Sequence, residues 1–342
     1  MCLRNIYYPL VRDENDKRKI LFNYGIKILD RETFSDMVNI RRECHYARLG
    51  ASKYQLLNRL FDVEHIIDID KMVQVPCGCC RECLDDISRQ WAFRILKEAS
   101  KYDNNYFITF TFDDEHVPSN GMLDSLFYTP FNKTLKNKLR SIGCKSDFRF
   151  YGIGEYGSKG GRPHYHCIYF NLDIPDLKFK CKDKKGFLHF ESKFLESIWR
   201  NGFVDIGTVD VGSACYVARY CEKKRRLNKS ERQELLDKGV VPEFSRMSRR
   251  PGIGADALEE LQQDFERGVF THFVHGKSYS LPLYYSRKIK ELLEGSKVLE
   301  EYEAQALQNS MTKINEYLCI ADTGVDLQIV LDEKDVVKKR NL

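Results

Sequence analysis

Two histidines separated by one residue form the first group able to do chemistry. His164 and His166 flank Tyr165 at the start of a segment, 164–170, that is predicted to be a strand. Residues two apart on a strand project from the same face, so the two imidazoles would lie side by side, as a chelating pair must. The pattern therefore indicates a metal site, although two histidines on a solvated strand face would look the same.

A carboxylate from the preceding strand is the first choice for a third metal ligand. Glu155 ends a predicted strand at 148–155, and the glycine-rich segment 156–163 predicts a hairpin loop between the two strands. Glu155 would reach the histidines in one register only, since a one-residue slip turns a side chain to the other face. The alternative ligand is Asp113, which follows another predicted strand, and the alternative role for Glu155 is a salt bridge with Arg162.

Two tyrosines one helical turn apart supply candidate nucleophiles. Tyr216 and Tyr220 would share one face of a predicted helix, with Arg219 and Lys223 forming a second pair beside them. A phenol is a weak nucleophile near neutral pH because its pKa is about 10, but adjacent cations lower that pKa and a metal polarises a phosphate. This set suits attack on a phosphodiester, which leaves a phosphotyrosine link and a free 3′-hydroxyl. The alternative is that one tyrosine packs in the core and the cations are solvated.

Closely spaced cysteines suggest a second, structural metal site. The chain has 12 cysteines, and Cys77, Cys80 and Cys83 give the Cys-x-x-Cys spacing twice over. Structural zinc needs four ligands, and the fourth would come from one of three neighbours: Cys44, His45 or Cys79. The alternative is a set of reduced, partly buried thiols. Disulfides are not expected in a long chain with no sign of secretion.

Basic residues gather in three segments, 133–140, 223–229 and 246–250, with tyrosine and phenylalanine interspersed. Grooves of this composition bind single strands through phosphate neutralisation and base stacking. For the first segment an ordinary solvated surface is the favoured interpretation. The expected DNA-binding residues come from the other two: Lys224, Arg225, Arg226, Arg249 and Arg250.

Composition limits the remaining possibilities. The 342 residues are 42% hydrophobic and 31% charged, and the net charge is +5, so a large core and a well-solvated surface are both expected. No stretch approaches the ~18 apolar residues of a membrane span. The first residues contain no apolar signal core, and a cytoplasmic location with no membrane partner is expected.

Helices and strands of the expected types surround these residues. Residues 106–112 should form a strand with one apolar face and one face carrying Thr109 and Thr111. Residues 203–209 should be extended, and Val75 should end a strand before Pro76. Helices are expected at 84–102, at 129–142 with Thr129 as the cap, at 192–199, from about 214 to 226 with Ser213 as the cap, and over most of 283–317.

These elements predict an α+β fold. A central, mainly antiparallel sheet would carry the His-x-His pair, with flanking helices and the tyrosine helix packed across the active-site face. The expected divisions are an N-terminal elaboration at 1–70, an endonuclease core with the cysteine cluster at 71–250, and a mainly helical extension at 251–342.

Taken together and in this order, the motifs resemble a known family. The chain is similar to replication initiators of the HUH endonuclease superfamily, and within it to those of small single-stranded DNA phages, the microviruses, especially the gokushovirus branch. The resemblance covers about residues 73–290. It rests on the segments 76–83 (PCGCCREC), 107–114 (FITFTFDD), 154–157 (GEYG), 162–166 (RPHYH), 216–220 (YVARY) and 248–254 (SRRPGIG).

The resemblance implies a metal-dependent endonuclease and strand transferase that uses Mg²⁺ or Mn²⁺. Such an enzyme nicks single-stranded DNA at a phage origin, starts rolling-circle synthesis and transfers strands between two tyrosines. Implied partners are the origin DNA and host replication proteins, in the cytoplasm of a bacterial host. One departure is Arg219, where relatives usually have lysine; arginine cannot shuttle a proton, so Lys223 would take that role. A second is Cys79 at the variable position of the cysteine motif.

Two other functions fit some of the same residues. A metal-dependent hydrolase could use His164, His166 and Glu155 with an activated water. A zinc-stabilised nucleic-acid-binding protein would need the cysteines and the basic segments but no catalysis.

Overall fold

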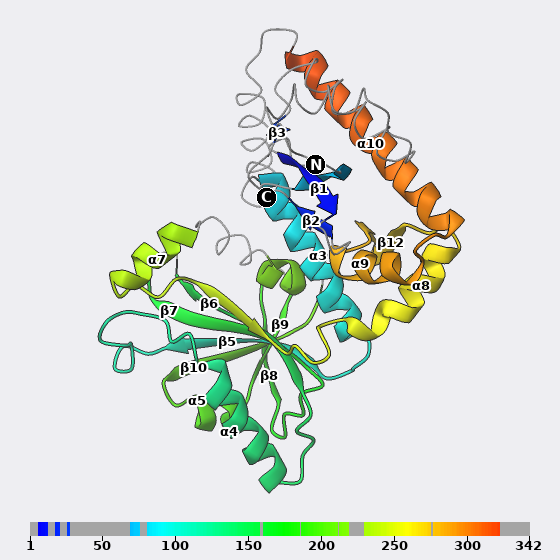
Figure 1. Ribbon diagram of the computed structural model, residues 1–342. Helices are drawn as coiled ribbons and strands as arrows, with labels where there is room; N and C mark the ends of the chain where they lie inside the picture. The colour runs from blue at the N-terminus through cyan, green and yellow to red at the C-terminus, as the bar shows by residue number, and fades with distance from the viewer. Residues whose placement is uncertain are drawn as a thin grey trace, which may run out of the picture. The chain divides into compact units, whose positions relative to one another are not determined.

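The computed structural model describes residues 6–12, 18–20, 26–27, 69–75, 81–157, 160–184, 186–210, 212–218, 229–274 and 276–321 (Figure 1). The chain divides into two compact units, Met1–Cys83 with Ala304–Leu342, and Leu84–Glu303. The first unit contains a small antiparallel sheet in which β1 (Ile6–Arg12) pairs with β2 (Arg18–Ile20), β3 (Ile26–Lys27) and β4 (Ile69–Val75). The predicted strand before Pro76 is therefore present as β4. The divisions expected at residues 70 and 250 stay predictions.

A seven-stranded sheet forms the centre of the second unit. Its strands run in the order β11-β6-β7-β5-β10-β9-β8, and every pair is antiparallel. This confirms the predicted α+β fold, and the histidine strand β7 lies inside the sheet. The strands are β5 (Asn105–Phe112), β6 (Arg149–Tyr156), β7 (Pro163–Phe170), β8 (Lys178–Lys182), β9 (Leu188–Glu191), β10 (Gly202–Thr208) and β11 (Phe244–Met247).

One face of this sheet packs against two helices. Alternate residues of β5 and β7, including Phe110 and Tyr165, belong to a core that also holds Leu135 of α4 (Tyr128–Ser141) and Trp199 of α5 (Lys193–Trp199). Figure 1 shows α4 and α5 on the same side of the sheet. The alternation predicted for 106–112 is confirmed, because Ile108, Phe110 and Phe112 are buried and their neighbours are half-buried.

The opposite face is the one that carries the histidines. Ile168 and Phe170 continue the side of His164 and His166 along β7, and they pack with Ile95 of α3 (Arg81–Ala99). Residues 212–218 are helical, and Ala214 and Val217 belong to the same core. The helix that carries Tyr216 therefore lies across the histidine face, as predicted.

A third core is built by elements that follow the sheet in sequence. Phe93 of α3, Leu261, Phe265 and Tyr285 are buried together. The elements are α7 (Lys229–Asp237), the 3₁₀ helix η2 (Ala255–Ala257), α8 (Leu258–Glu266), β12 (Thr271–Val274), β13 (Lys277–Ser280), α9 (Leu283–Leu292) and α10 (Lys297–Ala321). Most of 283–317 is helical, as expected. Within the described residues, no helix is long and apolar enough to cross a membrane.

Two of the three predicted helix caps are wrong. α4 begins at Tyr128 rather than after Thr129, because Phe127 and Tyr128 are buried in the core and draw the helix start forward. Ser213 does not cap the helical segment 212–218; Asp210 does, with its Oδ1 accepting from Ser213 N (2.6 Å) while Ser213 Oγ accepts from Asp210 N (2.8 Å). Ser192 is confirmed as the cap of α5, accepting from Leu195 N at 3.1 Å.

Tyr128 ties α4 to the two strands of the histidine hairpin. Its hydroxyl lies 2.7 Å from Ile153 O on β6 and 2.8 Å from His166 O on β7. The ring lies flat over Gly152, where an added Cβ would be 2.3 Å from Cζ of Tyr128. Only glycine leaves room for a ring at this position, so Gly152 is a packing requirement for the hairpin.

We predict that Gly152→Ala destabilises the protein, because the buried Tyr128 ring would have to move and lose its two hydrogen bonds. The expected loss in free energy of unfolding is about 1–3 kcal/mol, measured by chemical denaturation. Gly207→Ala in β10 is the control, since its Cβ would have no atom closer than 3.7 Å. Equal stability of the two variants would contradict this role for Gly152.

Candidate active site

The pairing of β6 with β7 brings a carboxylate beside the histidines. Glu155 lies directly opposite His164, and Ile153 lies opposite His166. Cross-strand partners in an antiparallel pair point to the same face, so Glu155, His164 and His166 project together. The register that Glu155 required is the one observed.

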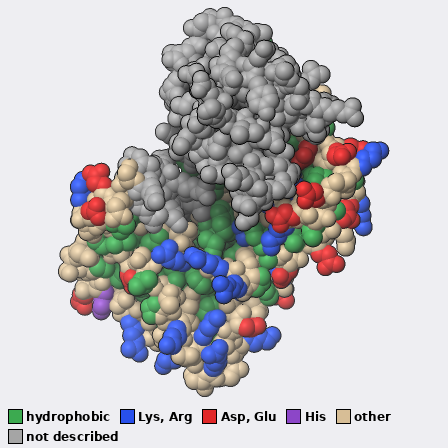
Figure 2. Space-filling model, in the orientation of Figure 1, with side chains coloured by type: hydrophobic (Ala, Val, Ile, Leu, Met, Phe, Trp, Pro, Cys, Tyr) green, Lys and Arg blue, Asp and Glu red, His purple; other side chains and the backbone are tan. Residues whose placement is uncertain are grey.

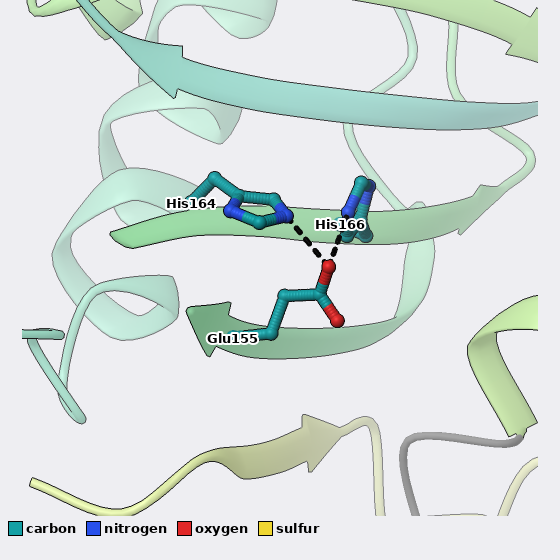
Figure 3. A group of neighbouring side chains, drawn as sticks. All are labelled: Glu155, His164 and His166. Carbon is teal, nitrogen blue, oxygen red and sulfur yellow. Dashed lines mark hydrogen bonds and ion pairs between the residues drawn. The ribbon is translucent and has the colours of Figure 1, made fainter. Parts of the chain in front are cut away.

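The three side chains converge on one point (Figure 3). Nε2 of His164 lies 2.6 Å from Oε1 of Glu155, and Nε2 of His166 lies 3.3 Å from the same oxygen. Their ligand atoms all lie within 4.8 Å of one another. Glu155 and His166 are buried and His164 is half-buried, so the group opens to solvent on the His164 side.

The other ring nitrogen of each histidine is held by a neighbour. Nδ1 of His164 lies 3.1 Å from the carbonyl oxygen of Arg162, and Nδ1 of His166 lies 2.9 Å from the hydroxyl of Thr109. A carbonyl only accepts, so Nδ1 of His164 must donate, which directs the Nε2 lone pair of a neutral ring toward Glu155. Such contacts orient histidines for metal binding.

Charge favours a cation at this point. Burial opposes ionisation of Glu155, but hydrogen bonds from His164 and His166 outweigh it and lower the pKa of the carboxyl to about 2. The carboxylate is therefore ionised at neutral pH. A lone pair facing a carboxylate oxygen is repulsive, so each Nε2 must either carry a proton or share a cation with Glu155.

The donor set fits a divalent metal. Two imidazole nitrogens and one carboxylate oxygen converge, and three ligands leave coordination positions for a substrate oxygen or water. Among the described residues this is the only such group of three. Asp113, the alternative ligand, instead accepts from Nδ1 of His116 at 2.7 Å. Arg162, the suggested partner of Glu155, pairs with Asp114.

Tyr216 lies next to the histidines. Its ring stands edge-on to the His166 imidazole at 5.4 Å between centroids and edge-on to Phe107 at 5.9 Å, and the residue is 39% exposed. Phe107 also stacks on His166, with centroids 5.5 Å apart. The structure therefore places one of the two predicted nucleophiles at the candidate metal site. Tyr220, Arg219 and Lys223 lie outside the described residues.

The other predicted site residues are only partly described. Cys83 is buried at the start of α3, and Cys77 and Cys80 lie outside the described residues, so the zinc site stays a prediction. Arg249 and Arg250 are exposed, whereas Lys224, Arg225 and Arg226 are not described.

The basic segment 133–140 lies on α4, which covers the sheet face opposite the histidines. In Figure 2, Lys and Arg side chains gather around the part of the molecule where Figure 1 draws α4. Its distance from the candidate metal site fits the solvated-surface interpretation of this segment.

The role of Thr109 was missed by sequence reasoning. Thr109 lies opposite His166 in the pairing of β5 with β7. The alternation of 106–112 placed its hydroxyl on the polar face, but only the pairing of the two strands shows which histidine it reaches.

Comparison with known proteins agrees with this site. The model of the family described as replication-associated protein ORF2 matches residues 105–225, which include β5, the histidine hairpin and both tyrosines. The replication-associated protein ORF2 of Spiroplasma virus 4 is 33% identical over 254 residues, covering 72% of this chain and 74% of that protein. The chain belongs to this family of phage replication-associated proteins.

Two further members of the family are similar over most of the chain. The replication-associated protein VP4 of Bdellovibrio phage phiMH2K is 32% identical over 214 residues, 61% of this chain and 65% of its own length. The replication-associated protein ORF4 of Chlamydia phage 1 is 25% identical over 278 residues, 78% of this chain and 67% of its own length. The chain thus spans just under two thirds of the phiMH2K protein. No solved structure matches the chain significantly.

We predict that Thr109→Val weakens metal binding, because His166 loses the hydroxyl that fixes its ring. Second-layer contacts of this kind change metal affinity by about 10- to 100-fold, which titration calorimetry with Mn²⁺ would measure. The control is Thr111→Val, since Thr111 is the next residue on the same face of β5. If both variants bound Mn²⁺ as tightly as the unmodified protein, Thr109 would not orient His166.

Proposed function

We propose that this replication-associated protein nicks single-stranded DNA at a phage origin by tyrosine attack and later rejoins the strand in rolling-circle replication. The observation that carries the proposal is the position of Tyr216, whose ring lies 5.4 Å from that of His166. A candidate nucleophile and a candidate metal centre then share one partly exposed site. Family membership supports a role in DNA replication.

Glu155, His164 and His166 would hold Mg²⁺ or Mn²⁺. When bound, such an ion polarises a phosphoryl oxygen and neutralises charge that develops on it. Thr109 and the Arg162 carbonyl keep Nε2 of each histidine directed at this position. The protein itself therefore fixes the ligands and leaves Tyr216 beside them.

The chemical step would be a transesterification. The phenolic oxygen of Tyr216 or Tyr220 forms a bond to phosphorus, and the bond from phosphorus to the 3′ oxygen breaks. The phenol loses its proton, the released 3′ oxygen gains one, and the 5′ phosphate stays on the tyrosine. Arg219 and Lys223 would lower the phenol pKa, and Lys223 alone could move the proton, because arginine stays charged.

The proposed partners follow from the same reaction. The substrate would be the single-stranded phage origin, and host replication proteins would extend the released 3′ end in the bacterial cytoplasm. Arg249 and Arg250 are exposed and would contact DNA phosphates, together with Lys224, Arg225 and Arg226.

Removal of either histidine should abolish nicking, because two ligands cannot hold the metal. We predict that His164→Ala and His166→Ala lose activity by at least about 100-fold, measured with end-labelled single-stranded origin DNA and Mn²⁺ or Mg²⁺ on denaturing gels. Excess chelator should have the same effect on the unmodified protein. His116→Ala, in the exposed turn after β5, is the matched control.

Full activity of either histidine variant would remove the metal centre from the mechanism. Cleavage that persists in chelator would indicate a metal-free tyrosine reaction. A protein that binds DNA but never forms a nick with any metal would be the non-catalytic alternative.

Two tyrosines should alternate, since rolling-circle replication cuts once to start and once to release the finished circle. We predict that Tyr216→Phe and Tyr220→Phe each keep some initial cleavage, lose strand transfer, and lose all cleavage when combined. Peptide mapping of trapped adducts should find DNA on both residues. Tyr106→Phe is the control, because Tyr106 packs against the core on the opposite sheet face.

Adducts confined to Tyr216, with normal strand transfer by Tyr220→Phe, would contradict the alternation. Cleavage by the double variant would instead favour a hydrolase that activates water at the same metal.

A further inference from the structure

An exposed aromatic ring lies in the same row of the sheet as the candidate metal ligands. Strand pairing aligns Glu155 with His164, His164 with Thr111, and Thr111 with Phe203. Aligned residues in an antiparallel sheet share a face. Phe203 therefore lies on the histidine face two strands from His164, ~10 Å at the usual strand spacing.

Phe203 breaks the burial pattern of its strand. Val204 and Ile206 point into the core beneath α4 and α5, and the alternate residues Phe203, Asp205 and Gly207 point to the histidine face. A phenylalanine at an outward position is expected to find cover, yet Phe203 is 67% exposed. The second core, which covers Ile168 and Phe170 on this face, does not include it.

The turn before β10 fixes the position of this ring. Gly202 has φ +140°, and a Cβ there would be 2.3 Å from Asp113 N and 2.4 Å from Thr111 O. Asn201 O accepts from Asp113 N at 3.0 Å, and Trp199 Nε1 donates to Thr111 O at 3.2 Å. The strand end is thus clamped against β5, and Phe203 is held toward solvent by its backbone.

Charges around the ring suit a polyanion. The Arg162 guanidinium donates to Phe112 O at 3.1 Å, and Phe112 pairs with Gly202, the residue before Phe203. The acidic neighbour on this face, Asp205, is paired with His189 at 2.9 Å. A cation therefore lies at the strand end next to Phe203, and the nearest carboxylate on its strand is already paired.

We propose that Phe203 is a base-stacking subsite for single-stranded DNA, holding a base close to the phosphate presented to the metal ligands. Exposed aromatic rings beside cationic groups bind single strands in this way, and any base can stack. The subsite rests on the proposed function and adds the element that would hold the strand across the sheet face.

The surroundings of Phe203 favour a base over a protein partner. Its neighbours on this face are Thr111, Asp205 and Gly207. An apolar protein interface would need a contiguous patch of several hundred Å², whereas a single planar ring among polar groups matches the size of one base.

The test is the affinity of a fluorescein-labelled, mixed-sequence single-stranded oligodeoxynucleotide, measured by anisotropy in chelator so that no cleavage occurs. Phe203→Ala should weaken binding by roughly 5- to 100-fold, the range seen when a stacking aromatic is truncated. Phe203→Trp should retain affinity. Phe179→Ala is the matched control, since Phe179 is 61% exposed on the same sheet and pairs with Phe190, on the opposite face.

Oligonucleotides with single abasic sites locate the stacked base. One position should weaken binding to the unmodified protein and have no effect on Phe203→Ala. Nicking by the unmodified protein combined with unchanged affinity of Phe203→Ala would overturn the subsite alone. A change in self-association in place of DNA affinity would also overturn it, whereas no binding or nicking by the unmodified protein would overturn the proposed function.

Discussion

The register between β6 and β7 is the constraint on which the candidate site depends. Glu155 and His164 are cross-strand partners, so their side chains share a face and meet at 2.6 Å. A slip of one residue would turn Glu155 toward α4 and leave two histidines without a carboxylate. The same register sets Tyr128 against Gly152 and extends the row to Thr111 and Phe203, so packing and site are fixed together.

Opposite faces of β7 are locked by different means. Tyr165, Cys167 and Tyr169 are buried beneath α4, while Ile168 and Phe170 are buried beneath α3 and the helical segment 212–218. His164 and His166 lie on the second face, and Thr109 and Tyr216 contact His166. A buried strand thus ends in a partly exposed chelating pair, which is how a rigid scaffold can present reactive groups to a large substrate.

The family relationship and the geometry support different parts of the interpretation. Membership of the phage replication-associated proteins ties the chain to DNA replication. The convergence of Glu155, His164 and His166 supports metal-assisted chemistry, and Tyr216 beside them suggests what attacks. An exposed ring at Phe203 adds a way to hold an unpaired strand, which a nicking enzyme needs before any bond is broken.

Sequence alone determined the periodic features. Alternation in 106–112, the glycine-rich loop before Pro163 and the His-x-His spacing set the strands, the hairpin and the shared face of the imidazoles, because side-chain direction on a strand depends only on position. Tertiary structure decided which strands are neighbours, and with that the choice of Glu155 over Asp113, the contact of Thr109 with His166 and the position of Phe203. It also moved two helix starts, since burial of Phe127 and Tyr128 and the reciprocal bonds of Asp210 with Ser213 outweighed local cap preferences. Contacts between residues far apart in the chain leave no local pattern, and so only the folded protein reveals them.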